Sequence, residues 1–398
     1  MRRTSTRARA GRRPLAVALA LALAPPVLTL APSAPAPAAA APAVRLKPTG
    51  GGVSEVDLAL AGRLAHPVTG GRRTDTLRTT GYSMVGVTWT GRRAPKRVAV
   101  RWPDGDGGWG RWRTLSRQTD LPSASEQRSR SGTQAMWTGR HRLVQVEVIG
   151  ALPKGLRLAL IDTGPAEETA TPAAARSVSA SPAVATTVVA RKKPTHAPKP
   201  AIYSRKAWGA DPSWRNGQPT YIRKIRQVHI HHTATANDYA PGDVPGLLRG
   251  MYYYHTHSLG WFDIGYNFLV DRFGRAWVGR SGGANKPVRG AHTLGFNHES
   301  VGIALIGRFG KQPPTNAALR AVVHIAAWKL DMYGGHPLRR IDVRSKGSDR
   351  FPAGTLVRLP TIDGHRDTNE TSCPGTALYD ELPALRRWIG KRVRRFSP

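Results

Sequence analysis

The sequence predicts a smaller all-β, sandwich-like domain followed by an α/β domain with a mixed central β-sheet flanked by helices. Three observations predict this arrangement. Apolar residues alternate with period two over residues 81–163, as in half-buried strands. Short apolar strands alternate with segments of helical spacing over residues 201–392. Between them, residues 164–200 are rich in Ala, Pro, Ser and Thr without apolar periodicity, which is typical of a disordered tether.

The N-terminus has the layout of a secretory signal peptide over residues 1–43. Several arginines precede an apolar run, residues 14–24, and small Ala- and Pro-rich sequence follows. The apolar run is short for a membrane span, which needs about 20 residues. An uncleaved anchor is the alternative. We expect a secreted or cell-wall protein without a stable membrane span after signal cleavage, and residues 44–80, which lack sustained periodicity, are expected to be poorly ordered.

The all-β unit is predicted from its alternating segments. We expect strands in VAVRW (98–102), RLVQVEVIG (142–150) and LRLALID (156–162), with turns such as PDGDGGWG between them. Aromatic side chains can stack on sugars, but a core position is the favoured interpretation for the tryptophans of this unit. They are Trp89, Trp102, Trp109, Trp112 and Trp137.

The α/β unit is predicted element by element. KIRQVHIHH (224–232) and SVGIALIG (300–307) are typical of buried strands, and YNFLVDRFGRAWVGR (266–280) of a hairpin. Helical spacing covers residues 243–258 and residues 315–335, the second with Thr315 as N-cap. A last helix over residues 376–393 is expected to be interrupted or restarted at Pro383.

The charge of the chain is strongly positive. Sixty Lys and Arg stand against 25 Asp and Glu, for a formal net charge of +35. A charge of this size indicates anionic partners. Because the chain is expected to be exported, we favour anionic wall polymers over nucleic acid. The alternative is that many of the scattered arginines reflect genome composition alone.

Cys373 is the only cysteine of the chain and lies in the polar loop TNETSCPG. An exposed thiol is a liability outside the cell. An inert buried cysteine fits this loop poorly, which leaves a nucleophile with His365 as its base, or a metal-bound thiolate. Catalytic zinc takes three protein ligands, commonly His and Cys. A third ligand is then needed, and VHIHHTAT offers His229 and His231 on one face of a strand, of which His231 lies nearer the strand end.

Five motifs occur in order over about residues 202–390: IYSRKAWGA, VHIHHTAT, GWFDIGYNFLVDRFGRAWVGR, GAHTLGFNHESVGIALIG and LPTIDGHRDTNETSCPG. Together they resemble the zinc-dependent N-acetylmuramoyl-L-alanine amidases of the amidase-2 family, which includes the peptidoglycan recognition proteins. The preceding β region and tether resemble exported actinobacterial members. The resemblance implies one Zn2+ held by His231, His365 and Cys373.

The resemblance also implies roles for other residues. Tyr266 matches the position that assists the attacking water, and Thr371 matches a position that is Lys or Thr in active members. His255, Arg280 and Asn297 match positions that line or border the peptide-stem groove. The general base stays open, and GRSGG (279–283) departs from the Gly-Trp that many recognition proteins carry, so the stem-peptide preference is not implied.

The expected activity is hydrolysis of the amide bond between N-acetylmuramic acid and L-alanine in peptidoglycan. The expected partners are the glycan strand and stem peptide, with anionic wall polymers, and no nucleic acid. Non-catalytic members of the family typically lack the cysteine, whereas this chain has it. The alternatives are a non-hydrolytic peptidoglycan-binding protein and a cysteine-nucleophile hydrolase of stem peptides, which a chelator would not inhibit.

Overall fold

The computed structural model describes residues 42–123, 126, 130–166 and 195–396. Nearly all of the expected signal peptide and most of the expected tether lie outside these residues. Among the described helices, none has both the length and the apolar character needed to cross a membrane.

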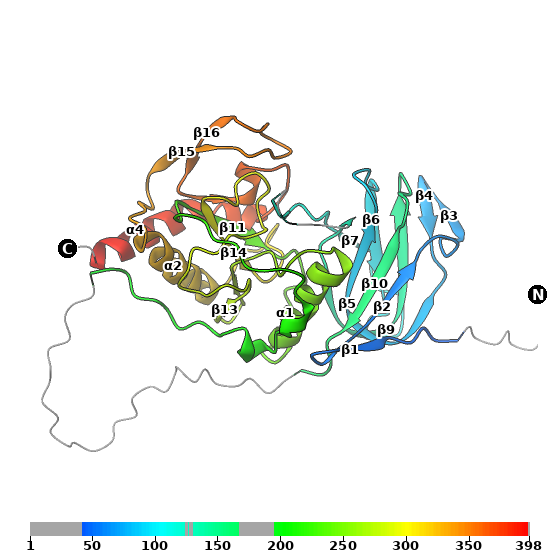
Figure 1. The fold of residues 1–398 in the computed structure, drawn as a ribbon. Coiled ribbons are helices and arrows are strands. Elements are labelled where there is room, and N and C mark those ends of the chain that lie inside the picture. The colour runs from blue at the N-terminus through cyan, green and yellow to red at the C-terminus, as the bar shows by residue number, and fades with distance from the viewer. Residues whose placement is uncertain (1–41, 124–125, 127–129, 167–194, 397–398) are drawn as a thin grey trace, which may run out of the picture. The chain divides into compact units, whose positions relative to one another are not determined.

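The N-terminal domain consists of strands joined into one hydrogen-bonded network (Figure 1). They are β1 (Lys47–Gly50), β2 (Val53–Ala59), β3 (His66–Val68), β4 (Gly71–Arg73), β5 (Leu77–Trp89), β6 (Arg97–Arg101), β7 (Arg113–Leu115), β8 (Ser131–Gly132), β9 (Met136–Ile149) and β10 (Arg157–Asp162). The first part of β9 pairs with β5, and its last residues pair with β4 on one side and β6 on the other. Apolar side chains from the strands that pair with the first part of β9 and from those that pair with its last residues meet in one shared core. The predicted all-β domain is confirmed.

The expectation of poor order over residues 44–80 is wrong. This range contributes β1 to β4 and the start of β5, and it places Leu60, Leu64 and Leu77 in the core of the domain. The strands are short and their turns are rich in glycine, so no alternating pattern runs long enough to be recognised in the sequence.

The tryptophans divide between core and surface. Trp89, Trp102 and Trp137 are buried, as expected. Trp109 is 36% exposed and Trp112 is half-buried, so the core interpretation is wrong for both. The Arg101 guanidinium lies 5.0 Å and 4.6 Å from the centres of their rings, a cation–π arrangement that keeps the two aromatic side chains at the surface.

The C-terminal domain alternates strands and helices. Its elements are β11 (Gln227–His232), α1 (Asp243–Tyr253), β12 (Phe268–Val270), β13 (Ala276–Val278), β14 (Ser300–Leu305), α2 (Asn316–Asp331), β15 (Arg340–Arg344), β16 (Leu356–Pro360), β17 (Ile362–Gly364), α3 (Thr376–Tyr379) and α4 (Leu382–Phe396). Short helical turns are η1 (Lys206–Trp208), η2 (Pro212–Trp214), η3 (Tyr254–Ser258) and η4 (His365–Asp367). The last helix is divided before Pro383, which lies in the first turn of α4, where a missing N–H costs least.

The central sheet of this domain has the strand order β13-β12-β14-β11-β17. β11 pairs in parallel with β14 and β17, and β13 is the antiparallel edge strand, so the predicted mixed sheet is confirmed. Figure 1 shows α2 and α4 on one side of the sheet and α1 on the other. On β11, Val228 and Ile230 belong to the cluster formed with α2 and α4. Because side chains alternate along a strand, His229 and His231 face the other side of the sheet.

Helix α1 and the π-helical turn η3 that follows it contact strands of the N-terminal domain. The Tyr254 hydroxyl donates to the carbonyl oxygen of Thr133 at 2.9 Å. A Cβ at Gly86 would lie 2.4 Å from the Tyr254 ring, so the tyrosine reaches this position only because residue 86 is glycine. One apolar cluster joins the two surfaces and includes Met84, Trp137, Ile161, Val244, Leu248 and Met251.

Candidate metal centre

The three predicted metal ligands come from two neighbouring strands and the loop that follows the second. His231 is the penultimate residue of β11. His365 comes directly after β17, which pairs with β11, and it opens the turn η4. Parallel pairing therefore brings the ends of both strands, and with them both histidines, to the same edge of the sheet. Cys373 follows in the loop after η4.

The loop that carries Cys373 is closed by backbone hydrogen bonds. The Arg366 N–H donates to the Cys373 carbonyl at 3.0 Å, and the Thr371 hydroxyl accepts from the Cys373 N–H at 3.1 Å. Just before the turn η4, a Cβ on Gly364 would lie 2.8 Å from the Tyr379 ring. A larger residue at position 364 would therefore displace the turn that places His365.

Within the described residues, His231, His365 and Cys373 form a buried group together with Asp120, and the ligand atoms all lie within 4.8 Å of one another. Cys373 Sγ lies 3.7 Å from His231 Nδ1. Asp120 Oδ1 lies 2.9 Å from His231 Nδ1 and 3.1 Å from His365 Nδ1. Ligand atoms about 2.0–2.3 Å from a tetrahedral zinc are about 3.3–3.6 Å apart, so this spacing is close to that of a zinc site.

The hydrogen bonding of the group also fits a metal ion. Asp120 Oδ1 and His365 Nδ1 are both buried, and neither has a hydrogen-bond partner despite their short separation. Buried polar atoms without a partner are rare and call for an explanation. A cation between them would supply the missing interaction, and two imidazoles, a thiol and a carboxylate are ligands that zinc prefers.

His231 is oriented by groups outside the ligand set. Its Nε2 lies 3.2 Å from His292 Nδ1 and 3.3 Å from the Thr293 hydroxyl. Burial lowers the pKa of His231 to about 4, against the opposing effect of the neighbouring Asp120 carboxylate, so the ring is neutral at pH 7. A neutral ring that donates from Nε2 presents the Nδ1 lone pair to the metal. A Cβ at Gly302 would lie 2.4 Å from the His292 ring, so glycine in β14 makes room for this arrangement.

Cys373 is 2% exposed, so the thiol is buried although its loop is polar in sequence. Burial raises the pKa of the Cys373 thiol well above its usual range, and Asp120 raises it further. A thiolate at this position therefore requires a cation beside it. The His232 N–H lies 3.4 Å from Sγ and is oriented to stabilise the negative charge.

Tyr266 lies fully buried beside the group. Its hydroxyl donates to Asp120 Oδ2 at 2.8 Å, and its ring centre is 5.6 Å from that of His231. Burial, with a further contribution from Asp120, raises the pKa of Tyr266 well above its usual range. The phenol therefore keeps its proton and is a hydrogen-bond donor in this site.

The other predicted site residues are also buried, or half-buried in the case of Thr371, around the same region. Asn297 Oδ1 accepts from the His292 and Thr293 N–H groups at 3.0 Å and 2.9 Å. His255 Nδ1 accepts from the Gly265 N–H at 3.2 Å, and the ring centres of His255 and Tyr266 are 6.2 Å apart. Arg280 Nη1 donates to the Ile264 carbonyl at 3.1 Å.

Asp120 was not predicted from the sequence. It belongs to the N-terminal domain, in the loop between β7 and β8, 146 residues before Tyr266. Burial alone would raise the pKa of Asp120, but the neighbouring His365 and His231 hold it well below its usual range, so it is a carboxylate. The one signal that could have found it is the long connection from Leu115, where β7 ends, to Ser131, where β8 begins, because long connections are often functional.

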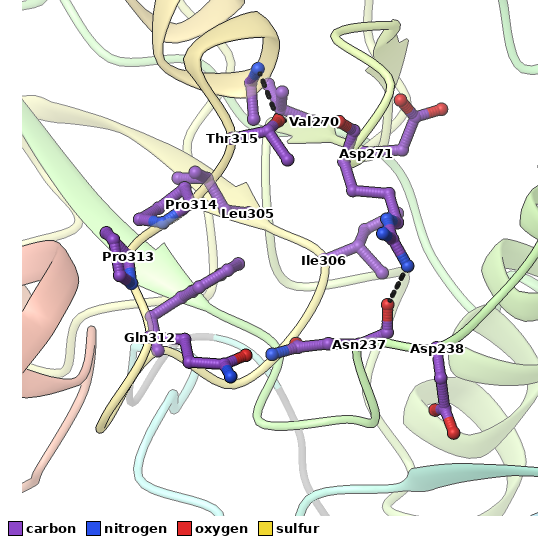
Figure 2. A pocket seen from close by; sticks show the side chains of 13 residues that line it. Asn237, Asp238, Val270, Asp271, Leu305, Ile306, Gln312, Pro313, Pro314 and Thr315 are labelled. Atoms are coloured by element: carbon purple, nitrogen blue, oxygen red, sulfur yellow. Dashed lines mark hydrogen bonds between the residues drawn. The ribbon is translucent and has the colours of Figure 1, made fainter.

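Two hollows contain none of the four clustered residues. One of them, drawn in Figure 2, lies at the ends of β12 and β14. Its volume is about 290 Å3, and Arg272 in its lining donates to the Asn237 carbonyl at 2.7 Å. A second cleft has a volume of about 650 Å3. It is lined in part by residues that come after β11 in the chain, by Trp112 and by four cationic side chains. The cations are Arg111, Arg113, Arg308 and Lys311.

The fold and the site define a two-domain protein with a buried His, Cys and Asp cluster suited to a metal ion. Comparison with known proteins gives its relatives. The N-acetylmuramoyl-L-alanine amidase family (amidase-2) matches residues 221–376, and the Rv3811 N-terminal galactose-binding domain-like family matches residues 32–194. Peptidoglycan-recognition protein SA from Drosophila melanogaster is 38% identical over 190 residues, which are 48% of this chain and 80% of that protein.

Two further known proteins are each similar to about half of this chain. The N-acetylmuramoyl-L-alanine amidase from Homo sapiens is 33% identical over 218 residues, which are 50% of this chain and 32% of the human protein. The crystal structure of peptidoglycan recognition protein-LE in complex with tracheal cytotoxin matches 46% of this chain and 93% of that chain, with 31% identity and a TM-score of 0.38. This chain belongs to the amidase-2 family, which includes the peptidoglycan recognition proteins.

Proposed function

We propose that this chain is a zinc-dependent amidase that cleaves the bond between N-acetylmuramic acid and L-alanine in peptidoglycan outside the cell. The observation that carries the proposal is the convergence of His231, His365 and Cys373 on one buried point. The relatives include an N-acetylmuramoyl-L-alanine amidase, which is consistent with this activity.

Each residue of the site has a part in the proposed reaction. Zinc held by His231, His365 and Cys373 would activate a water molecule and polarise the carbonyl group of the scissile amide. The Tyr266 hydroxyl, which stays protonated, would donate to the oxygen that becomes negative. Thr371 holds the Cys373 backbone through its hydroxyl and thereby fixes the ligand loop.

The substrate-contacting residues are proposed from the resemblance to the family. His255, Arg280 and Asn297 would contact the stem peptide, and the Arg280 guanidinium can bind a carboxylate of that peptide. The cleft with four cationic side chains and Trp112 suits an anionic or sugar-containing wall polymer.

A cysteine-nucleophile hydrolase is less well supported. A nucleophilic cysteine needs a lowered pKa, whereas burial raises the pKa of Cys373. A purely binding protein would not need a buried thiol facing two imidazoles. The geometry therefore favours the metal-dependent enzyme over both alternatives.

The test combines metal content with product analysis. We expect the purified chain to hold one zinc per molecule and to release stem peptides with a free N-terminal alanine from purified peptidoglycan over long incubation. A chelator should abolish release. In Cys373→Ser the affinity for zinc should fall about 100-fold or more, because a ligand is removed, and activity should be lost. Full zinc content and full activity in Cys373→Ser would show that the ligand assignment is wrong.

A further inference from the structure

The loop between β7 and β8 carries Asp120 into the candidate metal centre from the N-terminal domain. We propose that Asp120 is a fourth protein ligand of the metal and that residues 118–123 occupy the substrate groove, so that this conformation is a self-blocked form of the enzyme. The proposal rests on the metal site of the proposed function. We call residues 118–123 the blocking segment.

The two oxygens of Asp120 have different surroundings. Oδ2 accepts from the Tyr266 hydroxyl at 2.8 Å and from Gln134 Nε2 at 2.6 Å. Oδ1 faces His231 Nδ1 at 2.9 Å and His365 Nδ1 at 3.1 Å and makes no hydrogen bond. The side chain is fully buried. This is the arrangement of a carboxylate that binds a metal through one oxygen while neighbouring donors fix the other.

A fourth protein ligand changes what the site can do. Catalytic zinc sites keep one position for water and substrate, whereas sites closed by four protein ligands are structural. Asp120 Oδ1 lies where that exchangeable position would be, since it faces both imidazoles of the three-ligand set. Its removal from the site would convert a closed centre into an open one.

The neighbours of Asp120 contact the residues assigned to substrate. The Gln118 side-chain amide nitrogen lies 3.3 Å from His255 Nε2. The Thr119 hydroxyl donates to the Thr371 hydroxyl at 2.9 Å.

Two further contacts resemble those expected of a peptide substrate. Asn297 Nδ2 donates to the Leu121 carbonyl at 3.1 Å, as it would to a peptide carbonyl of the stem. The Glu126 carboxylate forms an ion pair with the guanidinium of Arg280, which is 4% exposed, and accepts from the Phe262 N–H at 3.1 Å. The blocking segment and Glu126 thus take the contacts that a peptide with carbonyl and carboxylate groups would make.

The blocking segment is tied to the strands of its own domain. The Gln118 N–H donates to the Gly132 carbonyl at 2.9 Å, and the Gln134 N–H donates to the Ser116 carbonyl at 2.7 Å. Substrate entry therefore requires this segment to leave the groove. If only a small fraction of the molecules has an open groove at any time, the apparent affinity for substrate is reduced by that fraction.

The experiment compares the full-length wild type with Asp120→Ala and Asp120→Asn after replacement of zinc by cobalt. The visible spectrum of cobalt reports its coordination, and azide serves as the probe for an exchangeable position. We expect azide to leave the wild-type spectrum unchanged and to shift the spectra of both variants. Asp120→Asn keeps the size of the side chain, so it separates loss of the anionic ligand from loss of packing.

Two further readouts accompany the spectra. Release of stem peptides should be about tenfold faster, or more, in Asp120→Ala than in the wild type, and a soluble muramyl peptide should bind about tenfold more tightly. Asp106→Ala, an exposed aspartate in the turn between β6 and β7, is the matched control and should behave as the wild type. Thermal unfolding verifies that each variant is folded.

The outcomes separate this proposal from the proposed function. If azide shifts the wild-type cobalt spectrum as it shifts the variants, Asp120 is not a ligand and this proposal is overturned. If neither the wild type nor the variants bind cobalt, the metal site of the proposed function fails, and this proposal fails with it. If the variants gain an azide-sensitive centre and bind the muramyl peptide but release no stem peptide, the blocking role stands and the amidase activity fails. Equal rates and affinities in all four proteins would overturn the occupancy of the groove.

Discussion

At the scale of single residues, the site depends on which groups keep their protons. Burial holds His231 neutral, which leaves a lone pair for a metal, and keeps Tyr266 protonated, which makes it a donor. In the described conformation the Tyr266 proton is directed to Asp120. In the proposed open form, without Asp120, the same proton would be available to a substrate oxygen.

Tyr266→Phe tests the donor role and is best made together with Asp120→Ala, so that the closed form does not mask the effect. Loss of one preorganised donor to a developing oxyanion lowers the rate about 10²- to 10³-fold. We expect this fall in stem-peptide release while zinc content stays at that of Asp120→Ala alone. An unchanged rate in the double variant would assign Tyr266 to packing rather than catalysis.

Local sequence patterns locate some residues of the site and miss others. Motif resemblance located His231, His365 and Cys373, which the structure brings together. Strand alternation left His229 and His231 as alternatives, and the structure pairs His229 with the buried Asp363 at 2.5 Å. Asp120 could not be predicted, because its role arises only when a loop of one domain contacts the ends of two strands of another.

At the scale of elements, strands and helices with long apolar patterns were predicted well. The Thr315 cap on α2 is present, with its hydroxyl accepting from the Ala318 N–H at 3.2 Å. The N-terminal strands of three to seven residues in the range 44–80 were missed, because their pairing partners lie elsewhere in the chain: β2 pairs with β10, and β4 pairs with β9. Cross-strand pairing of this kind leaves no local periodicity to recognise.

Helix α2 also carries a buried cation that makes stability depend on pH. Lys329 is 1% exposed, and its Nζ donates to the Ala284 and Lys286 carbonyls at 2.9 Å and 3.1 Å. Burial lowers the pKa of Lys329 to about 8 from 10.5. Between these two values the unfolded chain binds the proton that the folded chain has released, so the contribution to stability rises with pH in that window. Below about pH 8 the destabilising effect is fully present.

Lys329→Met removes this titration. We expect the unfolding free energy of the wild type to rise by about 3 kcal/mol relative to Lys329→Met between about pH 7 and pH 10.5. Urea denaturation at both pH values measures the difference. Lys311→Met, at an exposed lysine, is the control and should show no such rise. A pH-independent difference between wild type and Lys329→Met would contradict the lowered pKa.

At the scale of the whole molecule, a formal net charge of +35 bears on solubility and association rather than on the fold. The cleft of about 650 Å3, lined in part by residues that follow β11 in the chain, gathers four cationic side chains. Attraction between this surface and an anionic polymer is screened by salt, because the Debye length falls from about 10 Å at 0.1 M to about 3 Å at 1 M.

Wall binding should therefore weaken with salt, and it should depend on where the charges lie as well as on how many there are. We expect reversal of Arg111 and Lys311, both exposed in the cleft, to Glu to weaken co-sedimentation with purified walls about tenfold at low salt and to flatten its salt dependence. Arg92 and Arg93 are exposed in the turn between β5 and β6 and do not line the cleft, and their reversal changes the net charge by the same amount. If both double variants lose binding equally, net charge alone holds the protein at the wall. If only the cleft variant loses binding, the cleft is the contact surface for the wall polymer.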